Sequence, residues 1–285
     1  MLDDTIMTHR LRFFAVPLVL GALAVATAIS ASAAGIALVI DVVGDATVAR
    51  APSEPLKLLG ELNAGVQVAV SDRGQLVVFY LAEGAEYTLN GPGQYRILAK
   101  GPEPLRGASP PQRKATAAAY KELRLKTDRV AQGGMVMRGD SILASPVNEV
   151  VLDGDAAFRW RPFAREANYQ FELVDQAGAR LLTSETRETE IRLPPSLTLV
   201  PGHTYYWSLR GRDAGGDTFY RAAEFHVADA ALRQRIEAAQ PKPDAPFSER
   251  VLFAALLEEA GMKTAAQAQR RALAAERPVA WADAR

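Results

Sequence analysis

Histidine and cysteine, the residue types most often used for metal binding and nucleophilic chemistry, are scarce in this chain. The sequence has no cysteine and three histidines. His203 and His226 fall on two consecutive expected strands, and pairing Tyr205 with Phe225 keeps the apolar residues of both strands on one face. That register sets His203 opposite Val227 and turns His226 to the other face. Two histidines without a third ligand make a poor zinc site, so we predict no metal site and no cofactor.

Acidic side chains could supply a general acid and base or calcium ligands, but their spacing matches no known loop or catalytic motif. The chain has no G-x-S-x-G, H-E-x-x-H or G-x-x-x-x-G-K-[ST] sequence. We therefore predict that the protein has no catalytic residues and is not an enzyme. The acidic groups that we considered are Asp153 with Asp155, Asp213 with Asp217, Glu258 with Glu259, and Glu185 with Glu188 and Glu190.

Three aromatic residues of the second half, Trp160, Tyr206 and Trp207, could form a platform on which sugars stack. The alternative is that they fill a core, because aromatic residues at strand spacing usually do so. We favour the core, and the ligand-binding residues remain unknown at this point.

The first 33 residues have the order of a secretory signal peptide. A short cationic start is followed by an uncharged apolar run from residue 13 to 29 and by small side chains. We predict cleavage between Ala33 and Ala34, and hence a periplasmic or secreted protein with no integral membrane span. The alternative is an uncleaved signal that anchors the chain in the inner membrane.

Charge and composition narrow the class of partner. Lys plus Arg and Asp plus Glu each number 33, so the formal net charge is zero. A neutral chain has no overall field that would attract nucleic acid. An exported protein without cysteine must also rely on packed cores rather than disulfides.

Residues 37–105 read as a first β module. Short apolar runs alternate with segments rich in Gly, Pro, Asn and Asp, which is typical of antiparallel strands in a sandwich or barrel. The expected strands are residues 36–43, 46–51, 66–70, 76–81, 87–89 and 95–98.

This module resembles the FecR-like domain, named after a periplasmic regulator of iron-citrate uptake. The resemblance rests on the opening hairpin at residues 41–50, on "GELNAGVQVAV" from Gly60, on Gly74 and Gly84, and on "GPGQYRI" from Gly91. Full regulators of that family carry a cytosolic sigma-factor-binding segment before their membrane helix. The short segment before residue 13 leads us to expect no such activity.

A linker of residues 106–145 follows. Four prolines between residues 101 and 111 indicate a domain boundary. The basic residues from Arg113 to Arg129, set among alanines and leucines, predict a helix with a solvated basic face. The alternative is that this face touches a phosphate-bearing surface.

Residues 146–228 read as an immunoglobulin-like sandwich of seven strands. The expected strands are 149–152, 156–160, 168–174, 180–184, 188–193, 203–211 and 218–227. The module resembles a fibronectin type III module through "FRWRP" from Phe158 and "LVPGHTYYWSLRG" from Leu199. Modules of that kind mediate spacing or protein contact.

Residues 229–285 read as a helical tail. We expect helices at 230–239, after a cap at Ser248, and after a cap at Thr264. The last two resemble one tetratricopeptide-like hairpin, which cannot bury its own apolar face. We expect it to pack back on the sandwich, and the alternative is docking to another protein.

The predicted fold is therefore mainly β, with two antiparallel β modules, a linker helix and C-terminal helices. The predicted function is that of a non-catalytic cell-envelope adaptor or sensor-like protein that binds another protein through its β modules and tail. The alternative is a polysaccharide- or peptidoglycan-binding protein, so the partner is an envelope protein or a glycan.

Overall fold

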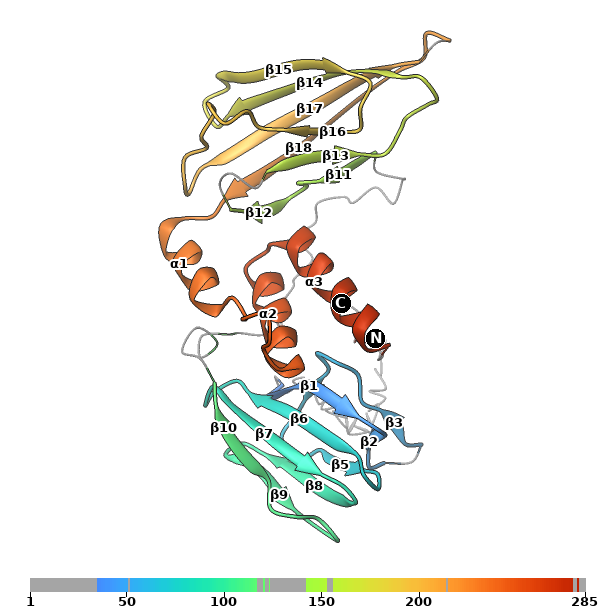
Figure 1. The fold of residues 1–285 in the computed structure, drawn as a ribbon, viewed down its shortest axis with the longest axis vertical. Helices are drawn as coiled ribbons and strands as arrows, with labels where there is room; N and C mark the ends of the chain where they lie inside the picture. Colours follow the sequence, from blue (N-terminus) through green and yellow to red (C-terminus); the bar gives the residue numbers. More distant parts are fainter. Residues whose placement is uncertain are drawn as a thin grey trace, which may run out of the picture. The chain divides into compact units, whose positions relative to one another are not determined.

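The computed structural model describes residues 35–50, 52–116, 120, 123, 142–152, 156–213, 215–278 and 281. The expected signal peptide, the Ala33–Ala34 cleavage position, most of the expected linker helix and the Asp153–Asp155 turn lie outside these residues. The predicted fold class is confirmed, since antiparallel sheets dominate and three helices follow them (Figure 1).

The first module consists of two five-stranded antiparallel sheets that share one core. One sheet has the order β10-β7-β6-β1-β4 and the other has the order β3-β2-β5-β8-β9. The strands are β1 (Ala37–Val43), β2 (Ala46–Val48), β3 (Glu54–Pro55), β4 (Glu61–Leu62), β5 (Gln67–Val70), β6 (Gln75–Tyr80), β7 (Ala85–Asn90), β8 (Gly93–Leu98), β9 (Gly101–Pro104) and β10 (Gln112–Ala115).

The central strands of the first sheet are buried on both faces. In β6, Leu76 through Tyr80 are all buried, although alternate side chains point to opposite sides. Val77 and Phe79 pair with Asp41 and Glu86, whose carboxylates contact the C-terminal helices. A sheet covered by helices on one side and by a second sheet on the other needs continuous apolar runs, and these strands have them.

The linker prediction is corrected at its start. Arg113 and Lys114 do not begin a helix but lie on β10, which pairs with β7 through partners such as Lys114 and Glu86. All four residues of β10 are exposed. A short, polar, charged strand at a sheet edge has no apolar alternation, so its sequence looks like that of a solvated helix face.

The second module is a β-sandwich of a three-stranded and a five-stranded sheet, with orders β11-β13-β16 and β12-β18-β17-β14-β15. Its N-terminal strand is split, because β11 joins the three-stranded sheet and β12 pairs in parallel with β18 in the five-stranded sheet. The strands are β11 (Leu143–Ser145), β12 (Glu149–Val151), β13 (Ala157–Trp160), β14 (Asn168–Asp175), β15 (Arg180–Thr186), β16 (Glu190–Arg192), β17 (Thr204–Arg212) and β18 (Thr218–Val227).

The predicted register of β17 and β18 is confirmed. Tyr205 pairs with Phe225 and Trp207 with Ala223. Tyr205 is buried, and its hydroxyl accepts a hydrogen bond of 2.8 Å from the backbone N–H of Val200, five residues upstream. This is the tyrosine-corner arrangement found at the start of the equivalent strand in immunoglobulin-type sandwiches.

The three helices lie close to where the sequence places them, at α1 (Ala230–Ala239), α2 (Phe247–Glu259) and α3 (Lys263–Glu276). The two predicted caps are wrong. Ser248 lies inside α2, and Thr264 inside α3. Each has a buried acceptor elsewhere that replaces capping: the Ser248 hydroxyl points to Glu86, and Thr264 donates to Glu149.

The helical tail packs mainly into the core of the first module, and not on the sandwich as expected. Val251, Leu252 and Leu256 of α2 belong to the same core as the first module. At the turn between α2 and α3, the carbonyl of Gly261 accepts a hydrogen bond of 3.0 Å from the N–H of Val150 on β12. Within the described residues, no helix is long and apolar enough to cross a membrane.

Candidate functional site

The two histidines are not brought together as a metal site. His226 lies on β18, and its Nδ1 is 3.1 Å from the hydroxyl oxygen of Thr204. His203 precedes β17, and its carbonyl accepts from the N–H of Val227 at 2.9 Å. In the part of the chain that the structure describes, no group of three or more His, Asp or Glu side chains could hold a metal ion.

Several of the acidic groups singled out in the sequence are held in ion pairs or turns. Glu258 pairs with Arg270, and Glu259 with Arg235 at 3.1 Å. Asp213 closes the turn between β17 and β18, where its carboxylate accepts from the N–H of Asp217 at 2.8 Å. A carboxylate committed in this way is not free to ligate a cation.

Glu190 shows the same behaviour on the three-stranded sheet. It accepts hydrogen bonds from Arg159 at 2.9 Å and from Arg192 at 2.7 Å. These bonds hold the pKa of the Glu190 carboxyl below its usual range, first through Arg159 and then through Arg192. A carboxyl group that stays ionised is unsuited to donate a proton near neutral pH.

Of the three candidate platform aromatics, two are core residues. Trp160 and Trp207 are buried, and the indole N–H of Trp207 donates to the carbonyl of Pro146 at 2.7 Å. Tyr206 differs, because it lies on the opposite face of β17 and is 42% exposed. Only Tyr206 can contact a ligand.

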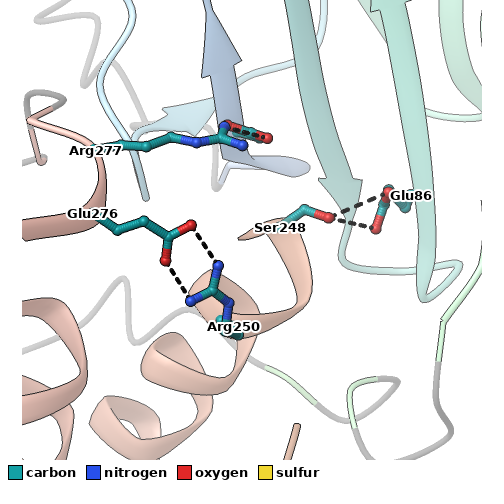
Figure 2. Close-up of polar contacts among 6 residues, drawn as sticks. Glu86, Ser248, Arg250, Glu276 and Arg277 are labelled. Atoms are coloured by element: carbon teal, nitrogen blue, oxygen red, sulfur yellow. Dashed lines mark hydrogen bonds and ion pairs between the residues drawn. The ribbon is translucent and has the colours of Figure 1, made fainter. Parts of the chain in front are cut away.

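A partly exposed polar cluster lies where the tail meets the first module (Figure 2). Arg277, after α3, donates to both carboxylate oxygens of Asp41 at 2.8 and 3.1 Å, and Arg250 forms a bidentate pair with Glu276. Burial raises the pKa of Asp41 despite the Arg277 charge. The charged groups of this cluster bond to one another, so we interpret the cluster as structural.

The candidate site is a depression on the outer face of the five-stranded sheet of the second module. Its volume is about 940 Å³. Its position follows from the alternation of buried and exposed residues along the strands. The side chains that β14, β17 and β18 turn away from the core all lie on this face. The lining residues are Asn168, Tyr169, Gln170, Glu185, Thr186, Arg187, Arg210, Gly211, Arg212, Thr218, Phe219 and Tyr220.

Strand pairing fixes the order of these groups across the sheet. Gln170 on β14 pairs with Glu185 on one side and Arg210 on the other, and Arg210 pairs with Tyr220 on β18. The four side chains therefore form one row across β15, β14, β17 and β18. Such a row is carried by the hydrogen-bonded ladder and not by a loop, so its spacing is fixed.

The arginines of this face are not neutralised by carboxylates. Arg187 donates to the amide oxygen of Asn168 at 2.9 Å, and the Arg210 guanidinium lies 5.4 Å from the ring centre of Tyr220. Neither these two nor Arg212 forms an ion pair with any residue that the structure describes. With Glu185 as the acidic member of the lining, the depression carries a local excess of positive charge.

Tyr220 adds exposed aromatic surface to the depression and is 54% exposed. Tyr206 lies on the same outer face, four residues before Arg210 on β17 and outside the lining. The site thus offers guanidinium and amide donors beside one tyrosine ring. This set can bind and orient an anionic or polar ligand.

Sequence reasoning missed this site, although the signal was present. In β17 the outward positions are Tyr206, Ser208, Arg210 and Arg212, read from the alternation of the strand. The aromatic and cationic character of that face could be read directly. Its link to Arg187 on the chain after β15 depends on strand order, which the alternation does not give.

Comparison with known proteins adds little to this geometry. No protein-family model matches the chain, and a search of curated proteins finds no match. One match among solved structures is the crystal structure of CopC from Methylosinus trichosporium OB3b. It is 16% identical, covers 32% of this chain and 95% of CopC, and has a TM-score of 0.25. We base no inference on a similarity at that level.

Proposed function

We propose that the protein is a non-catalytic adaptor of the cell envelope that binds a partner through the outer face of the second module's five-stranded sheet. The observation that carries the proposal is the depression there, lined by Tyr220 and by Arg187, Arg210 and Arg212, which have no carboxylate partner among the described residues. Arginine and tyrosine are enriched among the residues that supply most of the binding energy at protein interfaces.

The proposal changes the role of the tail. The tail was expected to offer a docking surface, but its apolar residues lie in the core of the first module and its turn bonds to β12. These contacts leave it little apolar surface for a partner. The tail instead contacts both modules, of which the second carries the binding face.

Sequence features support the envelope location and the module types. The cationic, apolar and small-residue blocks before residue 34 have the order of an export signal. The split first strand and the tyrosine corner at Tyr205 support the fibronectin type III resemblance, and the glycine positions of residues 60–93 support the FecR-like one.

The test is affinity capture from an envelope extract. Mature protein is compared with the Arg210→Gln, Arg212→Gln double variant and with Arg165→Gln, a matched control on an exposed loop of the same module. We expect the same captured protein with the mature chain and with Arg165→Gln, and loss of it with the double variant. Equal capture by all three would contradict the proposal.

A polysaccharide ligand is the second candidate, and the exposed rings of Tyr206 and Tyr220 favour it. Sugars stack on exposed aromatic rings and bond to amide and guanidinium donors such as those of Gln170 and Arg212. Sedimentation with purified cell wall tests this candidate. Enrichment that is lost on Tyr206→Ala, Tyr220→Ala replacement would support it, while the adaptor proposal predicts no enrichment.

A further inference from the structure

The outer edge of β18 is open over most of its length. β18 runs from Thr218 to Val227, and β12 pairs only with Phe225, His226 and Val227. Among the described residues, no strand pairs with residues 218–223 on that side. An unpaired strand edge is a template on which another extended chain can form a ladder.

The direction of the backbone groups at this edge follows from two printed bonds. Glu224 accepts at its carbonyl from the N–H of Asn148, and Ala228 donates its N–H to Val151. Because the backbone groups of alternate residues point to the same side of a strand, Ala222 and Tyr220 also direct their N–H and C=O to the open edge.

The edge lies beside the positive charge already described. Tyr220 lines the depression, and its cross-strand neighbour Arg210 is one strand further in. Arg221 lies on the edge itself and donates from its guanidinium to the carbonyl of Tyr220 at 2.8 Å. It forms no ion pair within the described chain. The carboxylates nearest in the sequence are Asp217 and Glu224, at the two ends of this open stretch.

We propose that the partner is an extended acidic peptide segment that adds to β18 as a further strand of the sheet. This inference rests on the proposed function and names the ligand class of its binding face. Backbone bonds to Ala222 and Tyr220 supply the register. Side chains on alternate positions of the peptide lie on the outer face. The added strand is two strand spacings, about 10 Å, from β17, a gap that a long arginine side chain and a peptide glutamate can bridge together across β18.

Arg221 has a defined part in this proposal. Without a partner its guanidinium occupies the carbonyl of Tyr220, which protects the edge from unspecific pairing. When the peptide binds, its N–H takes over that carbonyl and Arg221 turns to a peptide carboxylate. A basic or neutral strand offers no such exchange, so acidic segments are selected.

The experiment measures the binding of a fluorescent peptide of alternating glutamate and valine, about eight residues long, to the mature full-length protein by fluorescence polarisation. Two control peptides are used. In one, lysine replaces glutamate, and in the other the amide nitrogens are methylated at alternate positions. We expect binding of the first peptide only, with a dissociation constant below about 1 mM. The methylated peptide keeps the charge and loses the ladder bonds.

Variants of the protein separate the contribution of the backbone hydrogen bonds from that of the arginine charges. Ala222→Pro removes an N–H that faces the open edge, which an edge strand tolerates, and Ala222→Ser keeps it. Ala222→Pro is expected to weaken binding by at least about tenfold and Ala222→Ser to leave it unchanged. Arg210→Gln with Arg212→Gln should also weaken it by about tenfold, whereas Arg165→Gln should not. Thermal melts confirm that each variant is folded.

Several results would overturn the inference. They are the absence of binding below about 1 mM, equal binding of the methylated peptide, and binding of an anionic polysaccharide such as polygalacturonate that depends on the arginines but not on Ala222. If the Ala222→Pro variant does not fold, the comparison with the methylated peptide still tests whether backbone hydrogen bonds are required. Capture of a partner that requires Arg210 and Arg212 while no acidic peptide binds would leave the proposed function standing and remove only this inference.

Discussion

The backbone N–H of Thr264, in the first turn of α3, donates a 2.7 Å hydrogen bond to the buried carboxylate of Glu149 on β12. The Thr264 hydroxyl donates to the other oxygen of Glu149 at 2.8 Å, and Ser145 also donates to it at 3.1 Å. The negative end of this cluster faces the positive end of the α3 dipole. The strand that begins the second sheet is thus tied to the helical tail.

Replacing Glu149 should therefore weaken the attachment of the helical tail to the second module. Glu149→Ala leaves the N–H of Thr264 without its acceptor, which costs about 1–3 kcal/mol in the free energy of unfolding. Urea denaturation followed by circular dichroism measures this. Glu188→Ala, at an exposed position of the same module, is the control and should change stability by less than about 0.5 kcal/mol.

The tyrosine corner makes a second prediction. Tyr205→Phe removes the hydroxyl that accepts from Val200 and should lower the free energy of unfolding by about 1 kcal/mol. Tyr206→Phe, one residue further on the exposed face, should have no measurable effect. If both replacements cost the same, the buried hydrogen bond does not stabilise the sandwich.

The contact between Arg277 and Asp41 can be measured as a coupling. Arg277→Ala removes the partner of a buried carboxylate, so it should cost more than Asp41→Asn, with a difference on the order of 1 kcal/mol or more. A double-mutant cycle by denaturant unfolding gives the interaction energy. Additive effects would contradict a specific pair at this position.

The stability of the protein should depend on pH in part through the buried carboxyl group of Glu86. Burial is the largest cause that raises the pKa of Glu86 above its usual value, whereas Lys114 and the Ser248 hydroxyl lower it and Glu249 and Asp41 raise it further. A carboxyl group whose pKa is raised in the folded state favours folding below its unfolded pKa. That contribution is lost as the pH rises through the folded value.

Glu86→Gln should therefore become more stable relative to the wild type as the pH rises from about 4 to about 8. Unfolding in urea at several pH values measures the difference, and Glu83→Gln on the preceding turn, where the carboxylate is half-buried, provides the control. A difference between Glu86→Gln and the wild type that stays constant over this range would contradict the burial effect.

The parts of the fold set by local alternation could be predicted from the sequence. The register of β17 with β18 followed from keeping Tyr205 beside Phe225, and α1 was placed at its observed bounds. The short edge strands β3, β4, β9 and β10 were not found, because they have two to four residues and little apolar character.

The candidate site was harder to predict for a different reason. Arg187 follows β15 while Arg210 and Tyr220 lie on β17 and β18, and only the strand order brings them to one depression. The predicted helix caps at Ser248 and Thr264 were wrong for a similar reason. Their hydroxyl groups have long-range acceptors, Glu86 and Glu149, that no local pattern reveals.

The most direct measurement of the central claim is photo-crosslinking in cells that express the full chain. A photoreactive benzoyl-phenylalanine is placed at Tyr220 on the proposed binding face, or at Arg192 on the exposed side of the three-stranded sheet. We predict a discrete crosslinked adduct from position 220 that is absent from position 192. Adducts from position 192 alone, or equal adducts from both positions, would contradict a partner site on the outer face of the five-stranded sheet.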